Sequence, residues 1–344
     1  MIEEVLPNLY RIEVPLPQNP LKAINSYIIK GQGRSLIIDT GMNRPECLSV
    51  LSSGLKELDV DLKKADFFIT HLHADHLGLV SSLATDTSTV YFNQLDAGAP
   101  RPSSQGDKNS NLQPQASATK PGSSWDRNAS FACLNGFPED EQQRAMDNHP
   151  GRKYSGRGPV DFHFLKEGDT VSIGDYLFTC IETPGHTRGH MCLYESNKKL
   201  FMSGDHILID ITPNISLWSD DEDPLNEYLH SLDKVHNLDI ELVLPGHRSS
   251  IENCKERIEE LKHHHQTRAN EVLSILEKED QNAYQVAAQM TWDMDYASWE
   301  LFPPSQKWFA FGEAVAHLKY LEEQEKIQKQ MPGQVVVYSL KQQR

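Results

Sequence analysis

An apolar run passes directly into a group of metal-capable side chains in Phe67-Phe68-Ile69-Thr70-His71-Leu72-His73-Ala74-Asp75-His76. The run predicts a buried strand, and four imidazole or carboxylate side chains follow it within six residues. No single face of a helix or strand would collect all four. On a tight turn after the strand they can diverge toward two metal ions about 3.5–4 Å apart. Imidazole and carboxylate ligands without thiolate favour zinc, with manganese or iron as alternatives.

Three later segments repeat the pattern of an apolar strand, a glycine turn and a residue that can bind a metal. These segments are Thr183-Pro184-Gly185-His186, Ser203-Gly204-Asp205 and Leu244-Pro245-Gly246-His247. Glycine lets the chain turn sharply at the end of a strand, so the next side chain is presented at the rim of the sheet. Each segment alone is compatible with an ordinary turn. Together with the first cluster, the three predict a shared metal centre.

Strand-like and helix-like segments alternate through the first part of the chain, which favours an α/β layered fold. Residues 25–30 and 35–39 predict two paired strands, and residues 45–58 have the apolar spacing of a helix. Further short strands are predicted over 162–164, 170–173, 176–182, 190–194, 199–202 and 240–244, with a final strand near 335–338. Helices are predicted over 224–237, 252–279, 282–290 and 305–325.

Residues 95–160 look like an insertion between the strands and helices of the first part of the chain and the strands that begin at residue 162. Residues 99–128 are rich in Pro, Ser, Gln, Asn and Gly, which predicts an irregular loop, and helical spacing returns over 129–150. Loops of this length are unusual in compact domains and are often functional. Two interpretations stay open: a cover over the site, and a surface insertion without function.

Charge and cysteine content restrict the partners and the compartment of the chain. Its 344 residues carry a formal net charge of -16, which repels polyanions and disfavours nucleic acid, although bound metal ions could attract it locally. No apolar run approaches the roughly 20 residues of a membrane span, and the N-terminus lacks the features of a signal peptide. Five cysteines without a C-x-x-C pair fit a reducing compartment. We therefore expect a cytoplasmic protein that acts on a small-molecule substrate and does not associate with a membrane. The sequence does not predict the oligomeric state.

The order of the metal-capable motifs resembles that of the metallo-β-lactamase superfamily from about residue 20 to 250. The resemblance implies a four-layer αβ/βα sandwich with a dinuclear centre at one edge. Carried over position by position, the first metal would be held by His71, His73 and His186, and the second by Asp75, His76 and His247, with Asp205 bridging them.

Two positions distinguish the implied chemistry from that of other branches of the superfamily. His73 stands where diiron flavoprotein relatives carry a glutamate, which favours hydrolytic zinc chemistry over redox iron. Asp205 stands in a motif where one group of β-lactamases uses cysteine. Antibiotic hydrolysis is therefore not the expected role.

Further residues resemble the β-lactamase-like protein 2 subgroup, namely 205–208 with 211–216, His264 with Arg268, and 313–318. In that subgroup the C-terminal segment is a small, mainly helical, winged-helix-like domain. We therefore predict a metallo-β-lactamase-fold catalytic domain over residues 1–255, including the insertion at about 95–160. A helical winged-helix-like domain is predicted over residues 256–344.

The predicted function is that of a hydrolase with two divalent ions, Zn²⁺ in preference to Mn²⁺ or Fe²⁺. It would cleave an ester, thioester or lactone by a metal-bridging hydroxide, with Asp75 orienting the nucleophile or passing a proton. The alternative is a metal-dependent phosphodiesterase or endoribonuclease, which RNA-cleaving relatives in the subgroup support. A scaffold protein with a vestigial site is disfavoured, because all seven ligand residues are present.

The remaining histidines carry weaker signals. His190 follows His186 by four residues, and it could either orient a ligand or make a structural hydrogen bond. His263, His264 and His265 are consecutive on a predicted helix, where successive side chains point about 100° apart and cannot share one ion. A helix-surface or domain-interface role is therefore predicted for these three.

Overall fold

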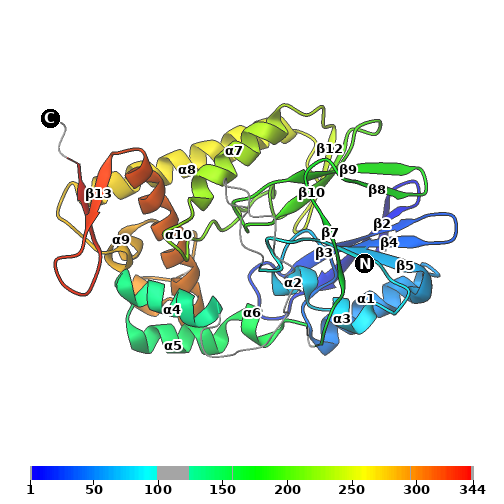
Figure 1. Cartoon of the computed structure of the whole chain (residues 1–344), viewed down its shortest axis with the longest axis horizontal. Helices are drawn as coiled ribbons and strands as arrows, with labels where there is room; N and C mark the ends of the chain where they lie inside the picture. Colours follow the sequence, from blue (N-terminus) through cyan, green and yellow to red (C-terminus); the bar gives the residue numbers. More distant parts are fainter. Residues whose placement is uncertain (1, 99–123, 157, 295, 342–344) are drawn as a thin grey trace, which may run out of the picture. The chain divides into compact units, whose positions relative to one another are not determined.

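The computed structural model describes residues 2–98, 124–156, 158–294 and 296–341 (Figure 1). The chain forms two compact units, each built from segments that are distant in sequence. The first unit comprises Met1–Ala116, Tyr154–Pro213 and Asp233–Arg257, and the second comprises Ser117–Lys153, Asn214–Leu232 and Ile258–Arg344. The division into domains 1–255 and 256–344 stays a prediction.

The first unit contains a seven-stranded sheet in the order β1-β2-β3-β4-β5-β6-β7. Its strands are β1 (Ile2–Leu6), β2 (Leu9–Pro15), β3 (Ala23–Lys30), β4 (Ser35–Ile38), β5 (Ala65–Phe68), β6 (Val90–Asn93) and β7 (Phe162–Leu165). Pairing is antiparallel from β1 to β4 and parallel from β4 to β7. The carboxyl ends of β4, β5 and β6 therefore meet at one edge, where ligands bind in open α/β sheets.

A second, five-stranded sheet has the order β12-β11-β10-β9-β8. Its strands are β8 (Thr170–Ile173), β9 (Tyr176–Glu182), β10 (Met191–Glu195), β11 (Leu200–Gly204) and β12 (Leu242–Pro245). A core packs between the two sheets and includes Ile29 and Phe68 from one and Phe178 and Leu193 from the other. The strands predicted over 162–202 are confirmed, whereas β12 begins two residues later than the predicted 240–244.

Helices cover the outer face of the seven-stranded sheet. Helix α1 (Pro45–Glu57) and helix α3 (Val80–Leu83) lie along this face, outside the stacked sheets (Figure 1). Leu51 of α1 is fully buried in a core shared with Phe67 of β5. On the other side, Lys234 in the last turn of α7 (Pro224–His236) donates to the Glu182 carbonyl at 2.7 Å. The unit is an αβ/βα sandwich, as predicted.

The second unit is mainly helical. It contains α9 (Ala283–Gln289), α10 (Pro304–Glu323) and the part of α8 (Cys254–Leu276) from Ile258 onward, together with a hairpin of β13 (Ile327–Gln330) and β14 (Val337–Leu340). The helices confirm the predicted C-terminal helical region. Strand β13 was not predicted, because Ile-Gln-Lys-Gln contains a single apolar residue. The winged-helix assignment stays a prediction.

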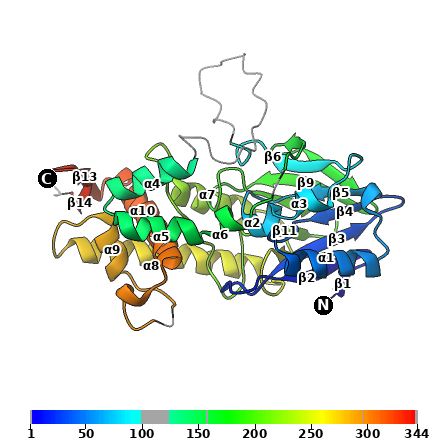
Figure 2. The same cartoon turned by 90° about the horizontal axis from the view of Figure 1, so that it is seen from below.

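Part of the predicted insertion packs on these C-terminal helices. Helices α4 (Ser124–Leu134) and α5 (Glu139–Asn148) belong to the second unit, where α5 lies against α10 (Figure 2). Lys307 Nζ lies 2.8 Å from Glu141 Oε1, and Tyr284 donates to Glu141 Oε2 at 2.8 Å. The prediction of an irregular loop is wrong for residues 124–128, because α4 begins at Ser124. Residues 99–123 lie outside the described residues, and the cover over the site stays a prediction.

Candidate metal centre

Strand ends bring all seven predicted ligand residues together in the first unit. His71 to His76 follow β5, His186 follows β9, Asp205 follows β11 and His247 follows β12. Their nitrogen and oxygen atoms form three overlapping groups, each within 4.8 Å: His71 with His73 and His186, His71 with His76 and Asp205, and Asp75 with His76 and His247. The first and third groups match the residues predicted to hold the first and the second metal ion, and the middle group contains Asp205, the predicted bridge.

The first group consists of three imidazoles. His71 Nε2 and His186 Nε2 each lie 3.0 Å from His73 Nδ1. Burial, followed by the neighbouring histidines, lowers the pKa of His71 well below its usual value, and burial and His186 lower the pKa of His73 to about 3. His71 and His73 are therefore neutral imidazoles near pH 7, which is the form that binds a metal ion.

The second group places two imidazoles beside Asp75. His247 Nε2 lies 3.5 Å from Asp75 Oδ2, and Asp75, His76 and His247 are all buried. Among the described residues, His76 Nε2, His247 Nε2 and Asp205 Oδ1 are buried without a hydrogen-bond partner. Leaving a buried polar atom unpaired typically costs about 1–3 kcal/mol. Three such atoms converging on one point fit a bound cation.

Asp205 lies between the two groups and presents one carboxylate oxygen to each. Oδ2 lies 3.6 Å from His186 Nε2 and 4.0 Å from His71 Nε2. Oδ1 lies 3.5 Å from both His76 Nε2 and His247 Nε2. This geometry fits a carboxylate that bridges two cations.

The charges of the second group balance. Burial opposes ionisation, but Asp205 raises the pKa of His247 to about 10, and Asp39 and Asp205 raise that of His76 well above its usual value. Burial also opposes ionisation of Asp75, yet the nearby His247 and His76 hold its pKa at about 2. Positive charge thus compensates the carboxylates, and a divalent cation would supply the same compensation.

Residues outside the predicted set orient the rings of the predicted ligands. Asp39 Oδ2 lies 2.7 Å from His76 Nδ1, and Thr70 Oγ1 donates to the same oxygen at 2.8 Å and lies 3.0 Å from His71 Nδ1. His247 Nδ1 donates to the Ala23 carbonyl at 2.7 Å. In each ring Nε2 is left facing the cluster, because Nδ1 is held from behind.

Asp39 was missed by the sequence analysis as a site residue. The available signal was its place in Asp39-Thr40-Gly41, which follows the apolar strand β4 as the recognised motifs follow β9, β11 and β12. Asp39 has a φ of 56°, so the backbone turns sharply where the strand ends. This turn brings its carboxylate to the edge at which β5 delivers His71 and His76.

The structure places two of the histidines outside the predicted ligand set, His190 and His265. His190 Nδ1 lies 2.8 Å from Thr183 Oγ1, while its Nε2 accepts the Asp205 backbone N–H at 3.1 Å, so His190 makes structural hydrogen bonds that hold the backbone at Asp205. Of the helix-surface and domain-interface roles predicted for His265, the helix-surface role is wrong. It is buried in the second unit, with Nδ1 3.3 Å from His317 Nε2.

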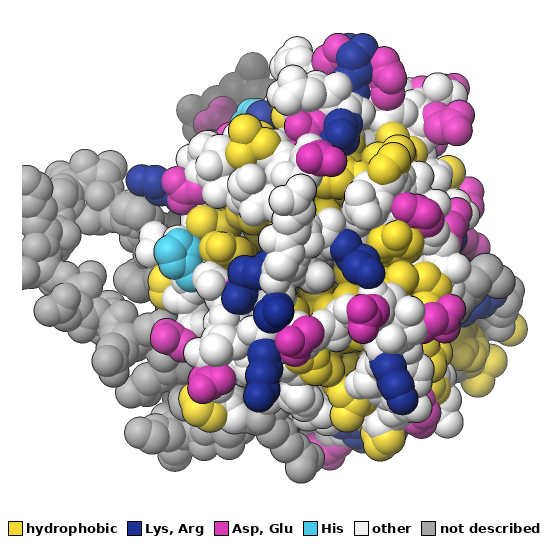
Figure 3. Space-filling view, turned by 90° about the vertical axis from the view of Figure 1, so that its right-hand side faces the viewer, with side chains coloured by type: hydrophobic (Ala, Val, Ile, Leu, Met, Phe, Trp, Pro, Cys, Tyr) yellow, Lys and Arg dark blue, Asp and Glu magenta, His cyan; other side chains and the backbone are white. Residues whose placement is uncertain are grey.

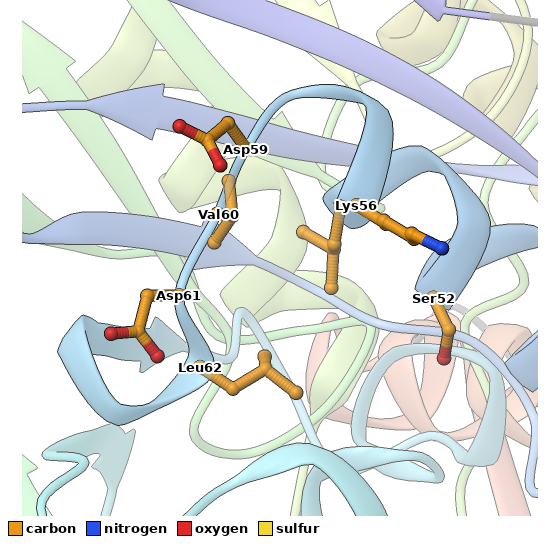
Figure 4. Close-up of a pocket in the computed structure, with 7 residues that line it drawn as sticks. Ser52, Lys56, Asp59, Val60, Asp61 and Leu62 are labelled. Carbon is orange, nitrogen blue, oxygen red and sulfur yellow. The ribbon is translucent and has the colours of Figure 1, made fainter.

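A pocket in the first unit contains none of the predicted ligand residues. It lies at the end of α1 and is lined by Ser52, Leu55, Lys56, Asp59, Val60, Asp61 and Leu62. Its two carboxylates point away from the amino group of Lys56 (Figure 4). The histidine and aspartate cluster is therefore the stronger candidate for a functional site.

The sequence model of the Metallo-beta-lactamase superfamily matches residues 20–247. The chain belongs to the metallo-beta-lactamase superfamily. A superfamily protein from Thermus thermophilus has a crystal structure similar to this one, with a TM-score of 0.77 and 25% sequence identity, over 98% of this chain and 100% of that chain. This likeness covers both compact units.

Two similar curated proteins carry names that describe a subgroup or an activity. The Beta-lactamase-like protein 2 homolog of Caenorhabditis elegans is 24% identical over 80% of this chain and 74% of its own length. Acyl-coenzyme A thioesterase MBLAC2 of Homo sapiens is 26% identical over 65% of this chain and 72% of its own length. The predicted superfamily and subgroup resemblance is confirmed, as is a metallo-β-lactamase-fold hydrolase at the level of the family. No helix in the described part of the chain is both long and apolar enough to cross a membrane.

Proposed function

We propose that this superfamily member is a dinuclear-metal hydrolase that cleaves acyl thioesters. The observation that carries the proposal is the placement of Asp205, whose two carboxylate oxygens face separate groups of nitrogen and oxygen atoms that could bind metal. The thioester belongs to the ester, thioester and lactone class predicted from the sequence. The human relative named as an acyl-coenzyme A thioesterase supports this choice within that class.

The seven clustered residues are the proposed metal ligands. His71, His73 and His186 would hold the first ion, Asp75, His76 and His247 the second, and Asp205 both. Nitrogen and oxygen donors without sulfur favour Zn²⁺, with Mn²⁺ or Fe²⁺ as alternatives. When bound, the ions would polarise the substrate carbonyl and lower the pKa of a water molecule.

Asp75 is the proposed catalytic residue. Without a bound ion, His247 and His76 hold the pKa of its carboxylate at about 2 despite burial, and a bound cation would favour the same ionised form. An ionised carboxylate only accepts hydrogen bonds, so Asp75 would orient the attacking water by accepting one of its protons in a hydrogen bond. Asp39 and Thr70 keep the rings of His76 and His71 fixed during the reaction.

Surface charge supports a small substrate over a nucleic acid. The net charge is -16, and on the face shown in Figure 3 basic and acidic side chains are interspersed rather than gathered into one basic field. A long polyanion would meet the field of the whole surface, whereas a small thioester meets only the field near the site.

A substrate panel tests the proposal. Purified protein loaded with Zn²⁺ would be assayed on acyl-coenzyme A thioesters, a lactone, a p-nitrophenyl ester, bis-p-nitrophenyl phosphate and single-stranded RNA. We expect thioester hydrolysis to be the fastest of these reactions. In His247→Ala its rate should fall by more than the roughly 10–100-fold loss seen when a group that only orients a metal ligand is removed. His163→Ala, at an exposed position, is the matched control and should keep full activity. Cleavage of RNA or the phosphodiester without thioester hydrolysis would overturn the proposal.

A further inference from the structure

Asp96 joins two loops that meet at the metal centre. It is the third residue after β6, and its Oδ2 accepts the Leu72 backbone N–H at 2.9 Å and the Thr187 hydroxyl at 2.7 Å. Its Oδ1 accepts the Gly189 backbone N–H at 2.6 Å. A Cβ at Gly189 would lie 2.9 Å from Asp96 Oδ1, so glycine permits this close approach. One carboxylate therefore holds three donors from two separate segments.

The three donors adjoin the proposed ligands of the first metal. Leu72 lies between His71 and His73, and Thr187 directly follows His186. The spacing between the two loops therefore sets where the three ring nitrogens meet. Asp96 accepts hydrogen bonds from backbone N–H groups and a hydroxyl beside those rings, and it is not one of the seven clustered residues.

We propose that Asp96 is a positioning residue that fixes the spacing of these two loops and thereby sets the affinity of the first metal position. The proposal rests on the proposed function, because it assumes that His71, His73 and His186 hold a metal ion. The role requires a carboxylate. The amide of asparagine has one acceptor oxygen, so Asp96→Asn would leave its NH₂ facing either the Leu72 or the Gly189 backbone N–H.

The second metal position has its own supports. Thr40 donates to the His76 carbonyl through its backbone N–H at 2.9 Å and its hydroxyl at 2.7 Å, and Asp39 holds the His76 ring. His247 is held by the Ala23 carbonyl. Loss of the Asp96 carboxylate should therefore weaken one metal position and spare the other.

The test is a metal titration of the metal-free full-length protein with Co²⁺ in competition with a chromophoric chelator. The spectra of His186→Ala and His247→Ala assign the absorption bands to the first and second positions. In Asp96→Asn we expect the Kd of the first position to rise roughly 10–100-fold, as for other groups that orient metal ligands, while the second stays within about 2-fold. The first-position band should also change, and excess metal should restore hydrolysis.

Asp66→Asn is the matched control. Asp66 also accepts a backbone N–H, that of Thr89 at 2.8 Å, but it lies near the start of β5, at the far end from His71. Both Kd values should be unchanged in this variant. Unchanged Kd values in Asp96→Asn would overturn the positioning role while the metal centre stands. Equal weakening of both positions would also overturn it, whereas a wild-type protein that binds no metal would refute the proposed function itself.

Discussion

Asp39 Oδ2 lies 2.7 Å from His76 Nδ1, and the same oxygen accepts the hydroxyl of Thr70, which lies 3.0 Å from His71 Nδ1. One carboxylate at the end of β4 thus orients a ring in each half of the cluster. Hydrogen bonding at Nδ1 leaves Nε2 of both rings as the nitrogen that faces the centre.

Asp39→Asn should weaken metal binding with little change in fold. Asparagine tolerates the left-handed backbone at φ 56°, so the turn can persist. The carboxylate of Asp39 accepts hydrogen bonds from the Thr70 backbone N–H, the Thr70 hydroxyl and His76. An amide has only one acceptor oxygen and cannot replace both carboxylate oxygens. We expect roughly 10–100-fold weaker binding of metal by chelator competition. An unchanged affinity would show that the rings are oriented without Asp39.

Removal of bound metal should lower the thermal stability. At a free concentration of 100 times its Kd, a ligand that binds only the folded state raises the free energy of unfolding by about 2.7 kcal/mol. Chelation followed by gel filtration should therefore lower the unfolding temperature of the wild-type protein, and Zn²⁺ should restore it. His247→Ala should respond less. An unfolding temperature that is the same with and without metal would contradict the assigned site.

The sequence predicted which seven side chains would cluster because each one follows an apolar strand at a turn, and these local signals are readable from residue types. Asp39 was missed although it follows an apolar strand in the same way, because its contact with Thr70 exists only in the fold. Asp96 was missed because its contacts with Leu72 and Gly189 form only at the folded sheet edge. The packing of α5 on α10 was missed for the same reason. Glu141 has no sequence signal that points to Lys307, 166 residues later.

The second unit should lose stability in acid through His265 and His317. Burial lowers the pKa of His317 to about 3 and that of His265 well below its usual value, whereas an unfolded histidine has a pKa of about 6.5. The unfolded state therefore binds protons first as the pH falls from about 6.5 toward about 3, and stability is lost across that window.

Urea unfolding from pH 7 to pH 5 measures this loss. We expect the double variant His265→Phe/His317→Leu to lose roughly 1–3 kcal/mol less than the wild type over that range. His163→Phe, at an exposed position, is the matched control and should follow the wild type. If the free energy of unfolding falls equally with pH in the wild type and the double variant, His265 and His317 are not the cause of the loss in acid.

Lys307→Met should destabilise the second unit. Lys307 is 5% exposed and lies 2.8 Å from Glu141, whose carboxylate also accepts the Tyr284 hydroxyl. Removing the ammonium leaves a largely buried carboxylate without its charge partner, which should cost roughly 1–3 kcal/mol in urea unfolding. Arg144→Met removes an exposed pair with Asp140 on the same α5 and should cost less than about 0.5 kcal/mol. Equal effects would show that the Lys307 pair adds no more than a surface pair.

The most direct test of the central claim is the metal content per chain, measured by elemental analysis of the wild type and Asp205→Asn alongside thioester turnover. The bridging carboxylate predicts two ions per wild-type chain, with metal content and turnover falling together in the variant. Asp205→Asn with two ions and full turnover would contradict the account, as would a wild-type chain that retains no divalent metal.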